Sequence, residues 1–285
     1  MVMLCNEIEP KQLEMYEKSG KYCGSQKVDG DHFKVLCKNI KWANGTTKEI
    51  RLINRHENDY TAQFPEIVAG LGVRKGVNCV LNGELAYWNS ETQKYDFNAF
   101  RSRQGLQKER MIMKRRLLFP CKLYVFDLIE VDGINMVNNP LYPYEKRYEI
   151  LKGIINNNNV TELLPIRNDL VTFFKEECLA DREGIVIKNI SNIYSDGRSD
   201  TILKVKNWHY DVIKFDNFED NRAGITISNK EGDRVLVAGK KAELVRACIE
   251  QSGYTYEKIR HLQDRTENNR LREPTHKEHI GVKNG

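Results

Sequence analysis

The sequence contains no long apolar run and no recognisable export signal. A membrane-spanning helix needs roughly 18 consecutive apolar residues, and no stretch of the chain approaches that length. The first residues, Met1 to Pro10, lack the basic segment followed by an apolar segment that marks a signal peptide. We therefore expect a cytoplasmic protein with no membrane partner.

Paired metal-binding cysteines are also missing. The 7 cysteines are scattered along the chain, and none belongs to a Cys-x-x-Cys pair. Zinc modules usually carry such pairs, so no zinc site is expected. An odd number of dispersed cysteines is typical of reduced thiols in a cytosolic protein.

What is present is the composition of a soluble globular protein. Of the 285 residues, 40% are hydrophobic and 30% are charged. This length suits one large domain, or one domain and a smaller second one, with a substantial core. The net charge of +5 fits a polyanionic partner such as nucleic acid, although many enzymes with neutral substrates are equally basic.

Up to Trp208 the pattern predicts antiparallel sheets with flanking helices. Asn44-Gly45 predicts a hairpin between two strands, and the asparagine run 156–159 predicts a solvated loop. Strands are predicted over 31–42, 46–53, 77–88, 121–131, 184–190 and 202–206, and helices over 10–20, 61–71, 144–155 and 170–180.

After Trp208 the character of the sequence changes. Short strands separated by Gly and Asn turns are predicted over 211–218, 224–228 and 234–237, followed by a helix over 242–251 and a polar tail. We place the domain boundary within 207–211, which gives domains 1–208 and 209–285. The second domain has the size and strand pattern of a small open barrel of the OB type.

One short stretch organises the candidate chemistry: Gly24-Ser25-Gln26-Lys27-Val28-Asp29-Gly30. A lysine at the end of a strand, beside a tight Asp-Gly turn, can be held rigidly and partly desolvated. Desolvation and neighbouring cations lower the pKa of an amine and make it a nucleophile. The pattern alone also fits an ordinary turn, because Asp-Gly is a common turn dipeptide.

Charged residues inside apolar strands form the next signal. Glu84 lies within one apolar segment, and Glu183 stands immediately before another. A buried carboxylate must be paired, hydrogen-bonded or bound to a cation, so each is either a functional group or half of a structural salt bridge. Lys204 and Lys206 are two apart on a strand and share a face, which either presents two ammonium groups to phosphate or is a solvated surface.

The order and the residues of these motifs resemble those of the covalent nucleotidyltransferases, which comprise ATP-dependent DNA ligases, RNA ligases and mRNA capping enzymes. The motifs are, in chain order, Lys27–Gly30, Arg55, Val80–Leu85, Tyr124–Leu128, Glu183–Lys188 and Leu203–Lys206. Three stretches make the likeness closest to small viral and bacterial ATP-dependent DNA ligases, namely Asn58–Ile67, Phe97–Arg103 and Ile193–Ser199. The likeness extends from Gly24 to Trp208 and more faintly to the C-terminus.

The resemblance implies a fold, a reaction and partners. The fold class is α+β, with an antiparallel-sheet, ATP-grasp-like nucleotidyltransferase domain followed by a small β-barrel OB-fold domain. The implied reaction seals nicks in duplex DNA in three steps through a lysyl-AMP intermediate, with ATP and Mg²⁺ or Mn²⁺. A monomer associated with nucleoid or viral DNA is expected. An RNA ligase, a capping guanylyltransferase and an inactive nucleic-acid-binding module are the alternatives.

The resemblance also implies roles for individual residues. The implied catalytic residues are Lys27, Asp29, Glu183, Lys204 and Lys206. The implied nucleotide contacts are Ser25, Gln26, Lys27, His32, Arg55, Glu84, Phe126, Glu183, Lys204, Lys206 and Arg272, and the implied metal residues are Glu84 and Glu183. Within this set, Phe126 would stack on adenine, Glu84 would contact the ribose, and Arg55 would contact AMP or the 5′-phosphate of the nick. Plain core packing of Phe126 and a surface position for Arg55 are the alternatives.

The sequence departs from the family pattern at three positions. His32 occupies a position that often holds arginine, and a histidine is only partly charged at neutral pH. Ser25 offers a hydroxyl where a carboxylate is common. The last motif, around Arg272, ends in Lys283 rather than arginine, and a lysine lacks the bidentate geometry of a guanidinium on phosphate.

Overall fold

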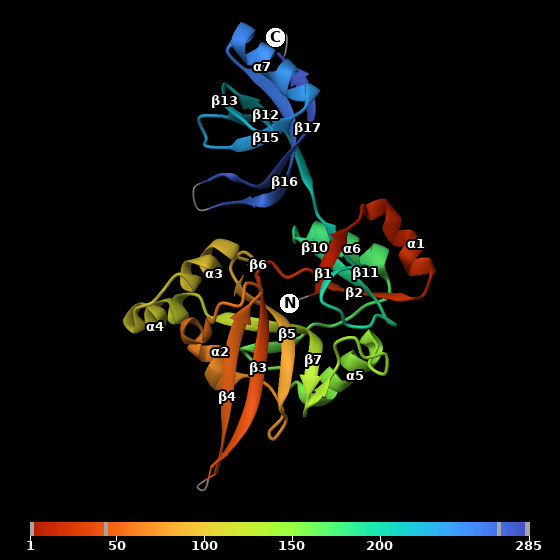
Figure 1. The fold of residues 1–285 in the computed structure, drawn as a ribbon. Coiled ribbons are helices and arrows are strands. Elements are labelled where there is room, and N and C mark those ends of the chain that lie inside the picture. The colour runs from red at the N-terminus through yellow and green to blue at the C-terminus, as the bar shows by residue number, and fades with distance from the viewer. Residues whose placement is uncertain (1–2, 43–44, 267–268, 283–285) are drawn as a thin grey trace. The chain divides into compact units, whose positions relative to one another are not determined.

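The computed structural model describes residues 3–42, 45–266 and 269–282. The chain divides into two compact units, Met1–Lys206 and Asn207–Gly285 (Figure 1). Each unit has its own hydrophobic core.

The first unit contains a large sheet of seven strands. Its main path runs β4-β3-β5-β7-β8, while β6 pairs with β5 and β9 pairs with β7. The strands are β3 (Asp31–Trp42), β4 (Gly45–Asn54), β5 (Cys79–Asn89), β6 (Lys94–Tyr95), β7 (Cys121–Val131), β8 (Ile134–Asn135) and β9 (Thr161–Leu163). All of these pairings are antiparallel except that of β7 with β9.

A second, four-stranded sheet completes the first unit. Its order is β1-β11-β10-β2, with β1 (Met3–Glu7), β2 (Tyr22–Gln26), β10 (Gly184–Asn189) and β11 (Gly197–Lys206). The sequence did not predict β1, which runs parallel to β11, and it gave no bounds for β2, the strand expected to end at Lys27. The prediction of mainly antiparallel sheets is confirmed, with these parallel pairs as a correction.

Helices and short 3₁₀ turns flank the two sheets. They are η1 (Pro10–Gln12), α1 (Leu13–Lys18), η2 (Thr61–Gln63), α2 (Pro65–Gly70), α3 (Phe97–Gln104), α4 (Glu109–Leu118), α5 (Tyr144–Ile154) and α6 (Leu170–Leu179). The single helix predicted over 61–71 is wrong. Pro65 cannot sit inside a helix, so the segment divides into η2 and a new helix that begins at Pro65.

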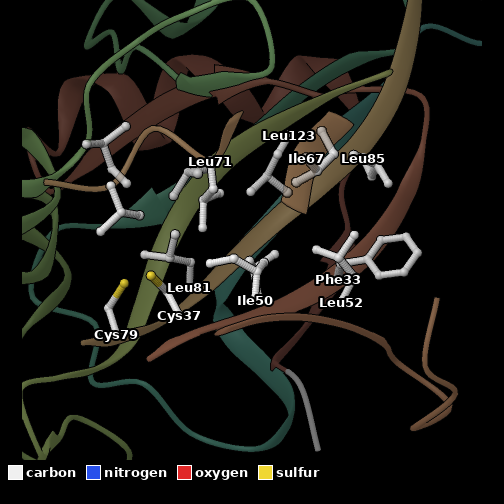
Figure 2. Packing of buried hydrophobic residues seen from close by; sticks show 14 of the residues in the cluster. Phe33, Cys37, Ile50, Leu52, Ile67, Leu71, Cys79, Leu81, Leu85 and Leu123 are labelled. Carbon is white, nitrogen blue, oxygen red and sulfur yellow. The ribbon is translucent and has the colours of Figure 1, made fainter. Parts of the chain in front are cut away.

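The main core lies between the large sheet and α2. Phe33, Val35 and Cys37 alternate along β3 and are fully buried on one face, as their spacing predicts. Figure 2 shows Phe33 and Cys37 in one cluster with Ile67 and Leu71, which come from α2 and the residue after it. This packing fixes β3 and β5, which carry His32 and Glu84 of the candidate site.

The second unit consists of two three-stranded antiparallel sheets and one helix. The sheets have the orders β12-β16-β17 and β13-β14-β15. Their strands are β12 (His209–Phe215), β13 (Asn217–Asn221), β14 (Gly224–Ser228), β15 (Arg234–Ala238), β16 (Thr255–Arg265) and β17 (Leu271–Gly281), and the helix is α7 (Lys240–Ser252).

Two predictions for the second unit are wrong. The strand expected over 211–218 is divided between β12 and β13, and the expected polar tail forms β16 and β17. The tail looked unstructured because its strands bury polar groups. Glu257, which is fully buried, accepts a hydrogen bond from the Thr255 hydroxyl, and its carboxylate oxygens lie 2.6 Å from His276 Nε2 and 2.7 Å from His279 Nδ1. This cluster hides the apolar alternation that normally marks a strand.

Candidate active site

Lys27 and Glu183 are brought together by the pairing of β2 with β10. Lys27 follows the last residue of β2, and its backbone N–H donates to the Gly184 carbonyl at 2.9 Å. This bond places Lys27 beside Glu183, the residue before β10. Lys27 Nζ lies 2.6 Å from Glu183 Oε1, and only 21% of the lysine side chain and 8% of the glutamate side chain are exposed.

The expected fall in the pKa of Lys27 is wrong for the unliganded protein. Burial lowers this pKa, but the Glu183 carboxylate raises it, and Glu84 and Asp29 add to that effect, so the net pKa of Lys27 is raised. The sequence prediction considered neighbouring cations, whereas the fold surrounds the amine with carboxylates. Lys27 is therefore an ammonium group paired with the Glu183 carboxylate.

The two carboxylate oxygens of Glu183 differ in their contacts, because one lies near two lysines and the other has no hydrogen-bond partner. Its Oε1 also lies 3.9 Å from Nζ of Lys206, which is itself buried. Its Oε2 is buried and has no hydrogen-bond partner. Burial raises the pKa of Glu183 more than the Lys27 ammonium lowers it. A buried, unpartnered carboxylate oxygen is suited to accept a cation or a proton.

The two strand lysines reach different partners. Gly184 pairs with Lys206, and Val186 pairs with Lys204, across β10 and β11. Lys206 Nζ approaches Glu183, whereas Lys204 Nζ lies 3.8 Å from Glu7 Oε2 on the unpredicted strand β1. The structure thus joins Lys206 directly to the Lys27–Glu183 pair and leaves Lys204 half-exposed, two residue pairs further along β10 and β11.

The Asp29-Gly30 dipeptide is shaped by close packing. A Cβ on Gly30 would lie 2.3 Å from the Leu85 carbonyl oxygen of β5, so no larger residue fits without displacing the backbone. Asp29 is almost fully buried, and its charge acts on Lys27, Glu84 and Glu183. Glycine is therefore required here for a close approach between the lysine loop and β5.

Three predicted nucleotide contacts meet across the large sheet. His32 on β3 pairs with Glu84 on β5, and the His32 and Phe126 rings lie 5.9 Å apart. Burial lowers the pKa of His32 to about 4, so its ring is neutral at pH 7. Burial raises the pKa of Glu84 to about 8, although the Lys27 ammonium opposes the rise. A neutral imidazole, a carboxyl group and an aromatic ring share one small area.

Other predicted contacts lie at the edge of this area or face away. Ser25 is buried and, two residues before Lys27, lies on the same side of its strand. Gln26 faces the opposite way, where it donates to Glu177 and accepts from Tyr95, both at 2.9 Å. There Gln26 lines a cavity of about 440 Å³ that Lys27 and Glu183 do not line.

Arg55 and Arg272 are not brought to Lys27 by any contact within the first unit. Arg55 is exposed beyond the end of β4, and it is close enough to His32 to contribute to the fall in that residue's pKa. Arg272 lies in β17 of the second unit, where it pairs with Leu262 of β16. Lys283 lies outside the described residues.

Sequence reasoning gave no role to a buried charge cluster behind Phe126. Asp127 accepts from Arg147 Nε at 2.7 Å and from Lys188 Nζ at 3.3 Å. Lys188 Nζ also donates to the Phe126 carbonyl at 2.9 Å and lies 4.8 Å from the centre of the Phe126 ring. The cluster fixes the backbone and ring of Phe126. A lysine inside the apolar strand 184–189 was the signal, equivalent to that of Glu84.

The donor set near Lys27 fits a magnesium ion that is also held by substrate. Among the residues that the structure describes, no group of three or more His, Cys, Asp or Glu side chains is arranged to hold a metal. Mg²⁺ needs no such cage, because it commonly binds one or two carboxylates together with phosphate oxygens and water. The open Glu183 Oε2 supplies one such ligand, and Glu84 lies nearby.

In the described part of the chain, no helix has both the length and the apolar character needed to cross a membrane.

Comparison with known proteins identifies the family to which the chain is similar. The model of the ATP dependent DNA ligase domain family matches residues 3–206. A probable DNA ligase of Rhodococcus opacus is 26% identical over 197 residues, which cover 69% of this chain and 36% of that protein. The chain spans about a third of the length of the curated relatives it matches.

Solved structures support the same fold. A Lig E DNA ligase, described in work on DNA binding with a minimal scaffold, has a TM-score of 0.62 at 16% identity, covering 98% of each chain. A mycobacterial DNA ligase D complexed with ATP and MES has a TM-score of 0.57 at 17% identity, covering 99% of this chain and 95% of that one. The family match spans the whole first unit, including Lys27, Glu84, and Glu183. The chain therefore belongs to the ATP-dependent DNA ligase domain family.

Proposed function

We propose that this protein is an ATP-dependent DNA ligase that seals nicks in duplex DNA through an adenylate on Lys27. The observation that carries the proposal is the 2.6 Å contact of Lys27 Nζ with Glu183 Oε1, in a chain that belongs to this family. The predicted domains 1–208 and 209–285 would then be the adenylation domain and an OB-type domain. The two three-stranded antiparallel sheets of the second unit are compatible with a small barrel.

In the first step the Lys27 amine attacks the α-phosphorus of ATP. A P–N bond forms to AMP, the bond between the α-phosphorus and the bridging oxygen breaks, and pyrophosphate leaves. Lys27 must first lose a proton, and the Glu183 carboxylate that holds it is the nearest acceptor. A divalent cation at Glu183 Oε2 and Glu84 would offset phosphate charge and weaken the hold of Glu183 on Lys27. Lys206, and with it Lys204, would face the phosphates.

The nucleotide would lie over the area shared by His32, Glu84 and Phe126. Adenine would stack on the Phe126 ring, which Lys188 supports from behind. Glu84 would contact the ribose hydroxyls. Because the His32 ring is neutral at pH 7, it would pack or hydrogen-bond rather than neutralise phosphate. Ser25 and Asp29 would complete the wall next to Lys27.

The later steps transfer AMP to the 5′-phosphate of the nick and then join the strands. The 3′-hydroxyl attacks that phosphate, a phosphodiester bond forms, and AMP leaves. Arg55, which is exposed and close to His32, would contact AMP or the 5′-phosphate. Arg272, in the second unit, is the proposed contact with pyrophosphate.

The deciding experiment offers labelled ATP, GTP and NAD in parallel, followed by nicked DNA and nicked RNA. We expect label only from ATP, on Lys27, and sealing only of nicked DNA. Label from GTP would favour a capping enzyme, and preferential sealing of RNA would favour an RNA ligase. No covalent label from any nucleotide would favour a binding module.

A further inference from the structure

Helix α4 is exposed on almost every side. Of its ten residues, Glu109–Leu118, only Ile112 is buried, while Met111, Met113, Leu117 and Leu118 are exposed. Lys108, which precedes the helix, and Arg110 and Lys114 within it are exposed as well. None of these three basic side chains forms an ion pair with another residue of the described chain.

The segment that contains α4 carries an unusual concentration of positive charge. Between Arg101 and Lys122 there are eight basic residues and one acidic residue, Glu109, so this segment has a net charge of +7. The whole chain has a net charge of only +5. The basic character that composition assigned to the protein therefore resides in this short segment.

The charges of Arg110 and Lys114 do not stabilise the helix. Arg110 and Lys114 are four residues apart, and like charges at that spacing destabilise a helix. What holds α4 lies at its base. The fully buried Arg103 pairs with Glu66 and donates to the carbonyl of Phe119, which caps α4, at 3.1 Å. The base is thus rigid, and the basic residues remain available to a partner.

The helix pair α3–α4 is joined to the candidate active site. At the end of α3, Gln104 Nε2 donates to Asp31 Oδ2 at 2.8 Å. Asp31 directly follows the Asp29-Gly30 loop, and it contributes to the raised pKa of Glu84. Helices α3 and α4 pack against each other, and α3 packs on β5, as Figure 1 shows.

We propose that Lys108 and α4 form a docking surface for the sugar-phosphate backbone of duplex DNA beside the nick. This inference rests on the proposed function. The argument is charge complementarity: a polyanion is the partner that a rigid, unpaired cluster of cations fits. Met111, Lys114 and Leu118 share one helix face, so apolar and basic residues alternate there. A membrane-surface helix would separate them on opposite faces.

The test compares the full-length wild type with the triple variant Lys108→Gln, Arg110→Gln, Lys114→Gln. The matched control is Lys11→Gln, Lys75→Gln, Lys175→Gln, three exposed lysines on other elements. Binding of nicked duplex is measured between 50 and 200 mM salt. The salt slope is the slope of the logarithm of the binding constant against the logarithm of the salt concentration. Loss of three phosphate contacts would lower its magnitude by about 2.7, so the wild type should lose about 40-fold more affinity than the variant over that range. The control should keep the wild-type slope, and all three proteins should take AMP from ATP equally.

Three results would overturn the proposal. These are a wild-type salt slope in the α4 variant, an equal fall in the control, or loss of adenylation together with binding. Stronger binding of wild type than of the variant to anionic lipid vesicles, with equal DNA binding, would identify a membrane instead. A wild type that binds nicked duplex but takes no label from ATP would contradict the proposed function, and the α4 surface would still be judged by the slopes.

Discussion

Lys27 and Glu183 form a buried ion pair in which one glutamate oxygen, Oε1, lies 2.6 Å from the lysine and the other, Oε2, has no partner. The pair raises the pKa of Lys27, so the nucleophile is held in its protonated form until another charge competes for Glu183. Under the proposed function, this arrangement would couple activation of the amine to arrival of the nucleotide and its metal.

Glu183→Gln should reduce adenylation strongly at saturating Mg²⁺. The amide keeps the shape of the side chain but removes the charge that accepts the lysine proton and faces the cation, and we expect a loss of roughly a hundredfold. Glu177→Gln is the control, because Glu177 is equally buried but pairs with Arg182 and Gln26. Single-turnover label transfer measures both. A near wild-type rate for Glu183→Gln would contradict the role.

Glu84→Gln should change how stability depends on pH. Because the pKa of Glu84 is raised to about 8 in the folded protein, the folded state binds more protons than the unfolded state above pH 4.5. Its contribution to stability is therefore lost as pH rises through 8. Between pH 6 and pH 8 the wild type should lose about 2 kcal/mol relative to the variant. Parallel pH profiles of urea unfolding for the two proteins would refute this.

Asp127→Ala should destabilise the first unit by about 3 to 5 kcal/mol, because it leaves Arg147 and Lys188 buried without their shared carboxylate. It should also loosen Phe126 and so weaken ATP binding. Glu14→Ala, which breaks the exposed pair of Glu14 with Lys18, should have little effect on unfolding. Equal unfolding midpoints for the two variants would show that the cluster does not support the fold.

Gly30→Ala should displace the lysine loop, since the added methyl would meet the Leu85 carbonyl at 2.3 Å. We expect about 1 to 3 kcal/mol of destabilisation and a clear fall in the adenylation rate. Gly105→Ala is the matched control, because nothing lies within 4 Å of the position of its Cβ. If the Gly30 variant adenylates as fast as the Gly105 variant, the close approach is not needed for activity.

Some of the site could be predicted from the sequence because the signal was a charge in an apolar strand. Glu84, Glu183 and Lys206 were found this way, and the structure gathers them around Lys27. The same signal at Lys188 was passed over. The pKa of Lys27 could not be predicted, because it depends on which side chains meet across two sheets, and pairing between distant strands leaves no local pattern.

The fold was predictable where one face of a strand is buried. Phe33, Val35 and Cys37 show the alternation plainly. It was not predictable for α4, which has one buried residue, or for β16 and β17, whose interior holds Glu257 and two histidines. In α4 exposed charged residues, and in β16 and β17 buried polar residues, occupy positions where regularly spaced apolar residues would allow a helix or strand to be predicted.

The most direct test of the central claim is intact mass after incubation with ATP and Mg²⁺, followed by peptide mapping. We expect that wild type gains one AMP, that the adduct maps to Lys27, and that Lys27→Ala gains none while remaining folded. Addition of pyrophosphate should remove the adduct from wild type. An adduct on another lysine, or one that persists in Lys27→Ala, would contradict the account.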